Sequence, residues 1–136
     1  MTPELPIEFL VLGIPMSSQA SSKSKQKWMA NVSSSARAAL PFNSSQLICP
    51  LAITIFIFPN GDMQGDLDNR AKPILDALIE CVYDDDDQID RLVMQRFRVD
   101  EYFRLTKPSN MLSAALEKAV PTVYVRVTDN LYEELI

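Results

Sequence analysis

Residues 47–58, LICPLAITIFIF, limit the possible folds of this chain more than any other stretch. From residue 51 onward, every residue of the run except Thr54 is apolar. Because alternate side chains of a strand point to opposite faces, this strand would be apolar on both faces. Such a strand is typical of the middle of a sheet that is covered on each side. The run therefore predicts a central strand with helices packed over the sheet.

Apolar periodicity predicts the other elements on either side of this strand. In chain order they are a strand at 7–13, a helix at 25–40, a helix from about 69–73 to the acidic run at 84–87, a strand at 92–99, a helix at 106–119 and a strand at 123–127. Strands and helices alternate, which predicts an α/β (α+β) fold with a mixed sheet of about four strands and helices packed on it. A length of 136 residues fits one domain, 1–136.

Several features exclude whole classes of protein. No stretch approaches the roughly 20 apolar residues that span a bilayer, so no membrane association is expected. Cys49 and Cys81 lie in apolar surroundings, which favours structural thiols of a cytoplasmic protein. Histidine is absent, which excludes triads with a histidine base and most zinc sites. Any chemistry must rely on carboxylates, lysine, arginine, hydroxyls or bound ions.

The acidity of the chain is local. Residues 62–90 carry ten acids and two bases, whereas residues 1–61 carry net +2 and residues 91–136 net +1, out of a total of −5. Clustered carboxylates repel one another, so this density indicates that something cationic binds there.

Two groups of aspartates divide this acidic block. In an extended segment, Asp66 and Asp68 would point to one side, with the intervening Leu67 turned into the core. Gly65 would allow a close approach of the backbone. The four aspartates at 84–87 are expected to end the preceding helix, where the helix dipole disfavours them unless a cation compensates. Oxygen ligands of this kind suit Mg²⁺.

Lys72 lies four residues after Asp68. A lysine beside a bound phosphate would offset the charge that develops during displacement at phosphorus. The simpler interpretation is an i, i+4 ion pair with Asp76 on a helix surface. Taken alone, Lys72 favours the ion pair.

Two segments of the block, GDLDNRAKPILDAL at 65–78 and VYDDDDQIDRL at 82–92, together resemble the RusA family of Holliday-junction resolvases. The family pattern consists of Asp-Leu-Asp-Asn, a lysine, a Leu-Asp-Ala-Leu helix and Asp-Asp-x-Gln-Ile/Val. Its positions here are Asp66–Asn69, Lys72, Leu75–Leu78 and Asp85–Ile89. The resemblance covers residues 7–100 well and the remainder loosely.

The resemblance implies a Mg²⁺-dependent homodimeric endonuclease, with Mn²⁺ as a possible substitute, that nicks branched DNA such as four-way junctions symmetrically. No nucleotide cofactor is expected. Asp66, Asp68 and Asp86 match the metal-binding carboxylates, and Lys72 matches the catalytic lysine. Supporting positions of the pattern are matched by Asp85, Asn69 and Gln88. The remaining acids of the block, Asp62, Asp84, Asp87 and Asp90, are interpreted as bystanders.

Basic residues near the predicted first and second helices are candidates for contact with the phosphate backbone of DNA. They are Lys23, Lys25, Lys27 and Arg70. Two features depart from the family pattern. The chain is acidic overall, and the segment 102–121 is longer than the compact pattern, which leaves a broader branched-DNA nuclease open.

Two other functions remain open from the residues alone. A non-catalytic acidic module that binds cations or mimics DNA would explain the aspartates at 84–87, but it gives Lys72 no role. An Asp-x-Asp sugar transferase would need a nucleotide-sugar domain that 136 residues hardly accommodate.

Overall fold

A computed structural model describes residues 2–134 of the chain and contains one mixed four-stranded sheet. Its strand order is β1-β4-β2-β3. The strands are β1 (Ile7–Leu12), β2 (Leu51–Phe58), β3 (Ile89–Arg96) and β4 (Thr122–Thr128). Only β2 and β3 are parallel, because the segment between them crosses over through a helix, whereas β4 is antiparallel to both of its neighbours. The predicted α/β (α+β) class with a mixed four-stranded sheet is confirmed.

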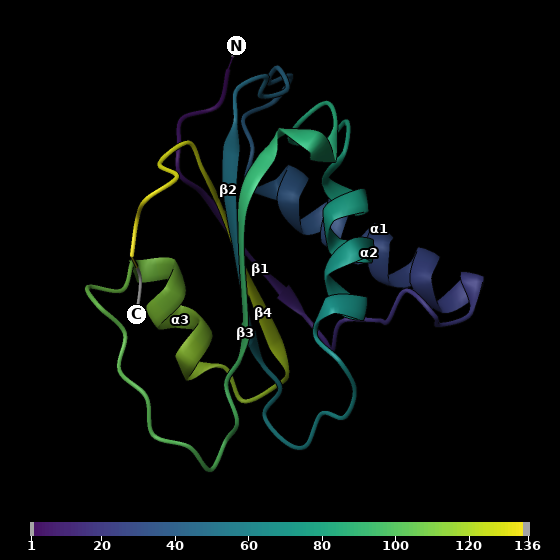
Figure 1. Cartoon of the computed structure of the whole chain (residues 1–136), viewed down its shortest axis with the longest axis vertical. Helices are drawn as coiled ribbons and strands as arrows, with labels where there is room; N and C mark the ends of the chain where they lie inside the picture. Colours follow the sequence, from purple (N-terminus) through teal and green to yellow (C-terminus); the bar gives the residue numbers. More distant parts are fainter. Residues whose placement is uncertain (1, 135–136) are drawn as a thin grey trace.

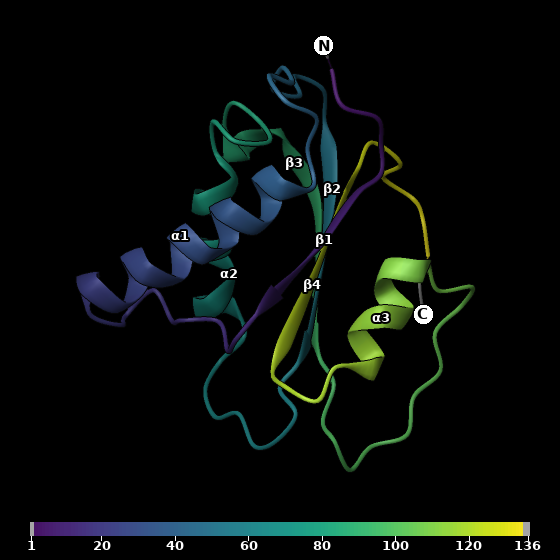
Figure 2. The same ribbon diagram turned by 180° about the vertical axis from the view of Figure 1, so that it is seen from behind.

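Helices cover both faces of this sheet. On one face lie α1 (Ser22–Ala38) and α2 (Asp68–Leu78), and on the other lies α3 (Asn110–Glu117) (Figures 1 and 2). A short 3-10 helix, η1 (Asp86–Gln88), leads into β3.

The strand β2 occupies the centre that its sequence predicts. Ile53, Ile55 and Ile57 are fully buried in the core under α1 and α2. Phe56 points to the opposite face and belongs to the core under α3, where its ring stacks on Tyr124 at 5.8 Å between centroids. Burial of both faces removes a large apolar area from water, which makes this strand the main hydrophobic support of the domain.

The end of α2 differs from its prediction. The helix stops at Leu78 and does not continue to the aspartates, because the chain turns through Glu80, which has a positive φ of 69°. Tyr83 is then fully buried and donates its hydroxyl to the carbonyl of Leu75 at 2.6 Å. The acidic run is therefore separate from the C-terminus of α2, and the expected clash with the helix dipole does not arise.

The ends of four other elements differ by a few residues from the ends that the sequence predicts, because capping residues determine where helices and strands stop. The helix α1 begins three residues early because the Ser21 hydroxyl accepts from the backbone N–H of Ser24. The strand β2 begins four residues late, after Pro50, which has no N–H to donate. Ser109 caps α3 by accepting from Leu112, so this helix is shorter than predicted. The strand β3 lies three residues earlier than expected.

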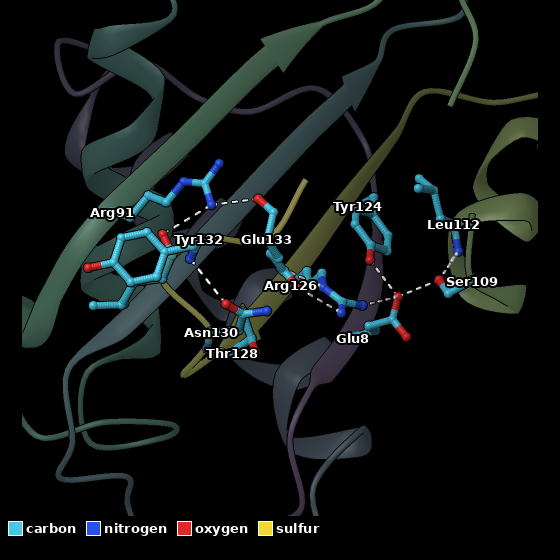
Figure 3. Close-up of polar contacts among 11 residues, drawn as sticks. Glu8, Arg91, Ser109, Leu112, Tyr124, Arg126, Thr128, Asn130, Tyr132 and Glu133 are labelled. Carbon is cyan, nitrogen blue, oxygen red and sulfur yellow. Dashed lines mark hydrogen bonds and ion pairs between the residues drawn. The ribbon is translucent and has the colours of Figure 1, made fainter. Parts of the chain in front are cut away.

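A polar network ties the face under α3 together (Figure 3). The Glu8 carboxylate on β1 accepts hydrogen bonds from Ser109 and Tyr124 and lies 3.4 Å from the Arg126 guanidinium on β4. Arg126 also donates to both carboxylate oxygens of Glu133, at 2.8 and 3.0 Å. The hydrogen bond from Ser109 to Glu8 thus fixes the start of α3 to the sheet, and the ion pair of Arg126 with Glu133 fixes the segment after β4.

None of the helices in residues 2–134 is long and apolar enough to cross a membrane. Of the two free thiols, Cys81 is buried as predicted and Cys49 is half-buried. Burial raises the pKa of the Cys81 thiol above its usual value, which keeps it protonated.

Candidate active site

One face of α2 carries three charged side chains in a row. Asp68, Lys72 and Asp76 follow at i, i+4 spacing, so each lies one turn, about 6 Å, from the next along the helix. The Lys72 ammonium contacts Asp76 Oδ1 at 2.9 Å and, from outside the helix, Asp86 Oδ2 at 3.1 Å. Lys72 thus binds one carboxylate on its own helix and a second that lies 14 positions further along the chain.

These contacts shift the pKa values of Lys72 and Asp86. The hydrogen bond to Asp76, followed by the one to Asp86, raises the pKa of Lys72 above its usual value. The same hydrogen bond from Lys72 lowers the pKa of the Asp86 carboxyl. Both groups are therefore charged near neutral pH. They are also open to ligands, since the side chain of Lys72 is 59% exposed and that of Asp86 34%.

The backbone around Asp86 is held by Gln88. The Gln88 side-chain oxygen accepts from the backbone N–H groups of Asp84 and Asp85, at 2.9 and 3.0 Å. Its amide nitrogen donates to the carbonyls of Leu47 and Cys49, at 2.8 and 3.1 Å. Four contacts from one side chain fix the acidic run to the segment before β2. Gln88, which the sequence placed only as a supporting position, is thus the residue that positions Asp86.

The loop that carries Asp66 is held by two arginines. Arg96 at the end of β3 donates to the carbonyls of Met63 and Gly65, at 3.0 and 3.1 Å. Arg70 on α2 donates to the carbonyl of Gln64, which lies between them, and also to that of Pro15. Three consecutive carbonyls are therefore bound by guanidinium groups. This arrangement fixes the backbone immediately before Asp66.

Gly65 is required by this arrangement. Its φ is +102°, a conformation that side-chain-bearing residues rarely adopt, and a Cβ added there would lie 2.9 Å from a terminal nitrogen of Arg70. The close approach expected at Gly65 is thus to the Arg70 side chain.

The predicted extended geometry of the Asp66–Asp68 pair is wrong. Leu67 has helical dihedral angles, φ −69° and ψ −41°, and Asp68 is already the first residue of α2. The helix starts early because Asp68 Oδ1 accepts from the N–H of Asn69, one of the donors that a helix start leaves free. Leu67 still packs against the core, as expected. Both carboxylates are exposed at the start of the helix.

Pro73 lies inside α2, in its second turn, and not in the first turn as its ring chemistry predicts. Proline has no N–H, so the carbonyl of Asn69, four residues earlier, loses its partner within the helix. That carbonyl accepts instead from the N–H of Ser18 at 2.6 Å. The proline thus leaves an acceptor for the loop before α1, residues 15–21, which contains three serines and is called the serine-rich loop below. This contact gives Asn69 a backbone role.

The four basic candidates for DNA contact separate into two groups. Lys23 and Lys27 are exposed on α1. Lys25 donates to the carbonyl of Ser18 at 3.0 Å, and the guanidinium of Arg70 is occupied by the loop carbonyls. Arg70 therefore positions the loop in this structure, and its contact with the phosphate backbone stays a prediction.

The carboxylates do not form a closed metal cage. In the described part of the chain, 2–134, no group of three or more Asp, Glu, Cys or His side chains is gathered closely enough to hold a metal ion. Asp76 and Asp86 instead share the Lys72 ammonium. Protein-bound Mg²⁺ commonly uses one or two carboxylates and completes its coordination with water and substrate phosphates. The exposed oxygen donors fit an ion held in this way.

Sequence reasoning missed two residues of the site. Asp76 was considered only as an alternative partner for Lys72, although it is one of two carboxylates on that ammonium. Arg96 was assigned to a strand with no role, because its contacts with the 63–65 loop cross 31 and 33 positions. The i, i+4 spacing identifies the first. No local pattern identifies the second.

Comparison with known proteins shows the family of the chain. A family model described as endodeoxyribonuclease RusA matches residues 17–106, a span that includes the serine-rich loop, α2, η1 and β3. No curated protein sequence matches the chain at a significant level. The matched span covers well over half of the chain and contains all four of the residues proposed from the sequence as catalytic. The chain therefore belongs to the RusA family of endodeoxyribonucleases.

Proposed function

We propose that this protein is a Mg²⁺-dependent endonuclease that resolves four-way DNA junctions or related branched DNA by paired nicks. In this proposal residues 1–136 form a single nuclease domain that acts as a homodimer in the cytoplasm during recombination and repair. Mn²⁺ would substitute for Mg²⁺. Membership of an endodeoxyribonuclease family supports the reaction class.

The position of Lys72 is the observation that carries the proposal. Its ammonium is held at 2.9 and 3.1 Å by two carboxylates, one turn along α2 from Asp68. A lysine whose only role was an exposed helix ion pair would need one partner, and such a pair contributes only a few tenths of a kcal/mol. A second carboxylate, held by the Gln88 contacts, gives Lys72 a defined position beside the acidic residues.

Each residue has a role that its chemistry allows. Asp66, Asp68 and Asp86 would hold the divalent ion, which supplies charge neutralisation and an acidified water when bound. Lys72 would donate to a non-bridging oxygen of the scissile phosphate and stabilise the negative charge that grows during in-line displacement. The arginine contacts to carbonyls 63–65 would keep Asp66 in place without adding positive charge at the metal position.

DNA binding must overcome the −8 charge of residues 62–90. A bound divalent ion would reduce that charge where the phosphate approaches. Lys23 and Lys27, exposed on α1, would contact the backbone at a distance from the scissile bond. Binding to DNA should therefore weaken as salt rises, with a slope that reflects few phosphate contacts.

Cleavage of a synthetic four-way junction tests the proposal. The protein should nick opposing strands in Mg²⁺ or Mn²⁺ and stop when a chelator is added. Asp86→Asn should lose cleavage, whereas Asp87→Asn, which removes the same charge from the next residue of η1, should retain it. A protein that leaves junctions, flaps and forks intact with either ion would overturn the proposal. Binding of a basic partner without metal would then favour an acidic module.

A further inference from the structure

Four basic side chains that the proposed function does not use lie between the end of β3 and the start of β4. They are Arg98, Arg104, Lys107 and Lys118. All four are exposed, and none of these side chains makes a hydrogen bond or ion pair with another of the residues 2–134. By contrast, the arginines just outside this segment, Arg96 and Arg126, are both held by oxygen acceptors. The four cations therefore fix no part of the fold and are free to bind a ligand.

Two of these cations lie at the rim of a small cavity on the face of the sheet that α3 covers. Three phenylalanine rings form its wall, those of Phe58, Phe97 and Phe103. Arg98 and Lys118 also line it, and no acidic residue of the described chain, 2–134, does so. The cavity measures about 150 Å³. Sites for drug-sized ligands measure about 300–1,000 Å³, so this cavity suits a single ring system.

The rings are packed against one another but are not covered. Phe97 is 5% exposed, and its ring centroid lies 5.0 Å from that of Phe58 and 4.4 Å from that of Phe103. The outer two, Phe58 and Phe103, are only half-buried, so part of each ring faces the cavity. Aromatic rings beside free cations are typical of surfaces that bind unpaired nucleic acid, because bases stack on the rings while cations contact the phosphates.

The cavity is partly built from residues outside the match to the family model. That match ends at residue 106, whereas α3 and Lys118, which close one side of the cavity, follow it. The sequence departs from the compact family pattern in the same region, 102–121. The acidic residues and Lys72 of the candidate active site all precede it. The cavity is therefore an addition that affects which DNA binds and leaves the reacting groups unchanged.

The cavity and the candidate active site share a loop. Since β2 and β3 are parallel, the loops 59–67 and 97–109 leave the same end of the sheet (Figures 1 and 2). Asn60 lines the cavity and donates its side-chain amide to the carbonyl of Ala119 at 2.6 Å. Asp66 follows six residues later, a separation of at most about 20 Å. A DNA strand covers that distance in about six nucleotides, at roughly 3.4 Å each.

We propose that this cavity takes one unpaired base of branched DNA, a few nucleotides from the cut. The base would lie against the rings of Phe58 and Phe103, and the flanking phosphates would contact Arg98 and Lys118. Removing a base from a duplex costs free energy, and least where the base is already unpaired. Forks and flaps carry such bases at the branch point. The inference rests on the proposed function and specifies its substrate: branched DNA with unpaired nucleotides should bind most tightly.

Charge decides between this occupant and an apolar side chain of another protein. A side chain inserted between the rings would cover them but would leave Arg98 and Lys118 without acceptors. A nucleotide supplies a planar ring and a phosphate together, so it matches both the wall and the rim of the cavity.

Binding of a labelled fork tests the proposal. Every protein in the assay carries Asp86→Asn, so that Mg²⁺ can be present without cleavage. Phe103→Leu keeps an apolar side chain but removes the ring, and it should weaken binding of the fork about 10-fold. Binding of a duplex of the same length should stay within about twofold of the parent, because a paired base does not enter the cavity. Phe103→Tyr retains a ring and should bind the fork as the parent does.

The phosphate contacts have a separate test in the salt dependence of fork binding. Arg98→Gln removes one of them and should reduce the slope of log affinity against log salt by about one. Arg37→Gln makes the same charge change at an exposed position near the end of α1, on the other face of the sheet, and should leave the slope unchanged. Equal slopes for the two variants would contradict the place of Arg98 at the cavity.

The outcomes also separate this proposal from the nuclease proposal. Fork binding that survives Phe103→Leu, or an equal loss for fork and duplex, would overturn the cavity. So would a change of mass in solution without a change of fork affinity, which would indicate a side chain of a second copy. If the parent binds forks through the cavity but the wild type cuts no DNA, the cavity stands and the nuclease is rejected. A wild type that cuts branched DNA, with fork binding insensitive to Phe103→Leu, would do the reverse.

Discussion

The two faces of the sheet each carry a cluster of charges, and the clusters are built differently. Under α3, the side chains of Glu8, Arg126 and Glu133 are only 13–17% exposed. Over α2, the side chains of Lys72, Asp76 and Asp86 are 34–59% exposed. The first cluster is enclosed and the second is open to solvent.

Donors and acceptors are also balanced differently. Glu8 accepts from two hydroxyls and faces Arg126, which in turn donates twice to Glu133. Over α2, one ammonium faces two carboxylates, with further aspartates before and after them. A cluster with its hydrogen bonds satisfied stabilises the fold, whereas an open cluster with excess negative charge is suited to bind a cation. The comparison predicts that substitutions in the first reduce stability and substitutions in the second reduce activity.

The largest effect should come from Asp68→Asn. Loss of a metal-binding carboxylate should lower the rate of junction cleavage by about 1,000-fold, roughly 4 kcal/mol in the activation free energy. Because Asp68 is exposed, the free energy of unfolding should change by about 0.5 kcal/mol or less. Cleavage rates and urea unfolding of the same sample measure both. A large loss of stability would mean that Asp68 acts mainly as part of the helix start.

Arg126→Met should show the opposite pattern. It leaves the largely buried carboxylates of Glu8 and Glu133 without their cation, which should cost about 3 kcal/mol of unfolding free energy. The remaining folded protein should cleave DNA at the wild-type rate. Urea unfolding and cleavage at low temperature, where the variant stays folded, check this. Unchanged stability would show that hydroxyl donors alone satisfy Glu8.

The elements whose apolar pattern spans a whole face could be predicted from the sequence. The strand β2 is apolar on both faces, and the structure buries both. Boundaries were less predictable because single capping residues such as Ser21 decide them. The end of α2 was misplaced because Val82 continues its apolar periodicity although the chain has already turned at Glu80. An apolar pattern shows which side chains are buried. When the turn after a helix is also buried, the pattern continues past the end of the helix.

The candidate site could be predicted only in part. The family pattern identified Asp86 and Lys72, which the structure brings within 3.1 Å. The supporting contacts could not be predicted, because Gln88 reaches across about 40 positions to Leu47 and Cys49. Such contacts depend on how the sheet brings distant segments together, and no local spacing encodes them.

Gly65→Ala should disturb the support of the site by an intermediate amount. The positive φ and the 2.9 Å approach to Arg70 should together cost about 2 kcal/mol of unfolding free energy. Cleavage should also fall, because displacement of Arg70 releases the carbonyl of Gln64. Gly61→Ala is the matched control, since an added Cβ there meets no atom within 4 Å and its φ is not positive. Equal effects of the two variants would contradict the role of Arg70.

The smallest effect should come from Asp76→Asn, and it tests whether the open cluster positions Lys72. An asparagine oxygen can still accept from the ammonium, but the bond loses its charge assistance. The value of kcat should fall about 5-fold with KM unchanged, because Lys72 would act on charge that develops in the transition state. Stability should change by about 0.5 kcal/mol or less, as for other exposed i, i+4 pairs. Asp76→Glu keeps the negative charge and should therefore retain most of the wild-type kcat. If Asp76 only stabilised the helix, kcat of the folded enzyme would be unchanged in both variants.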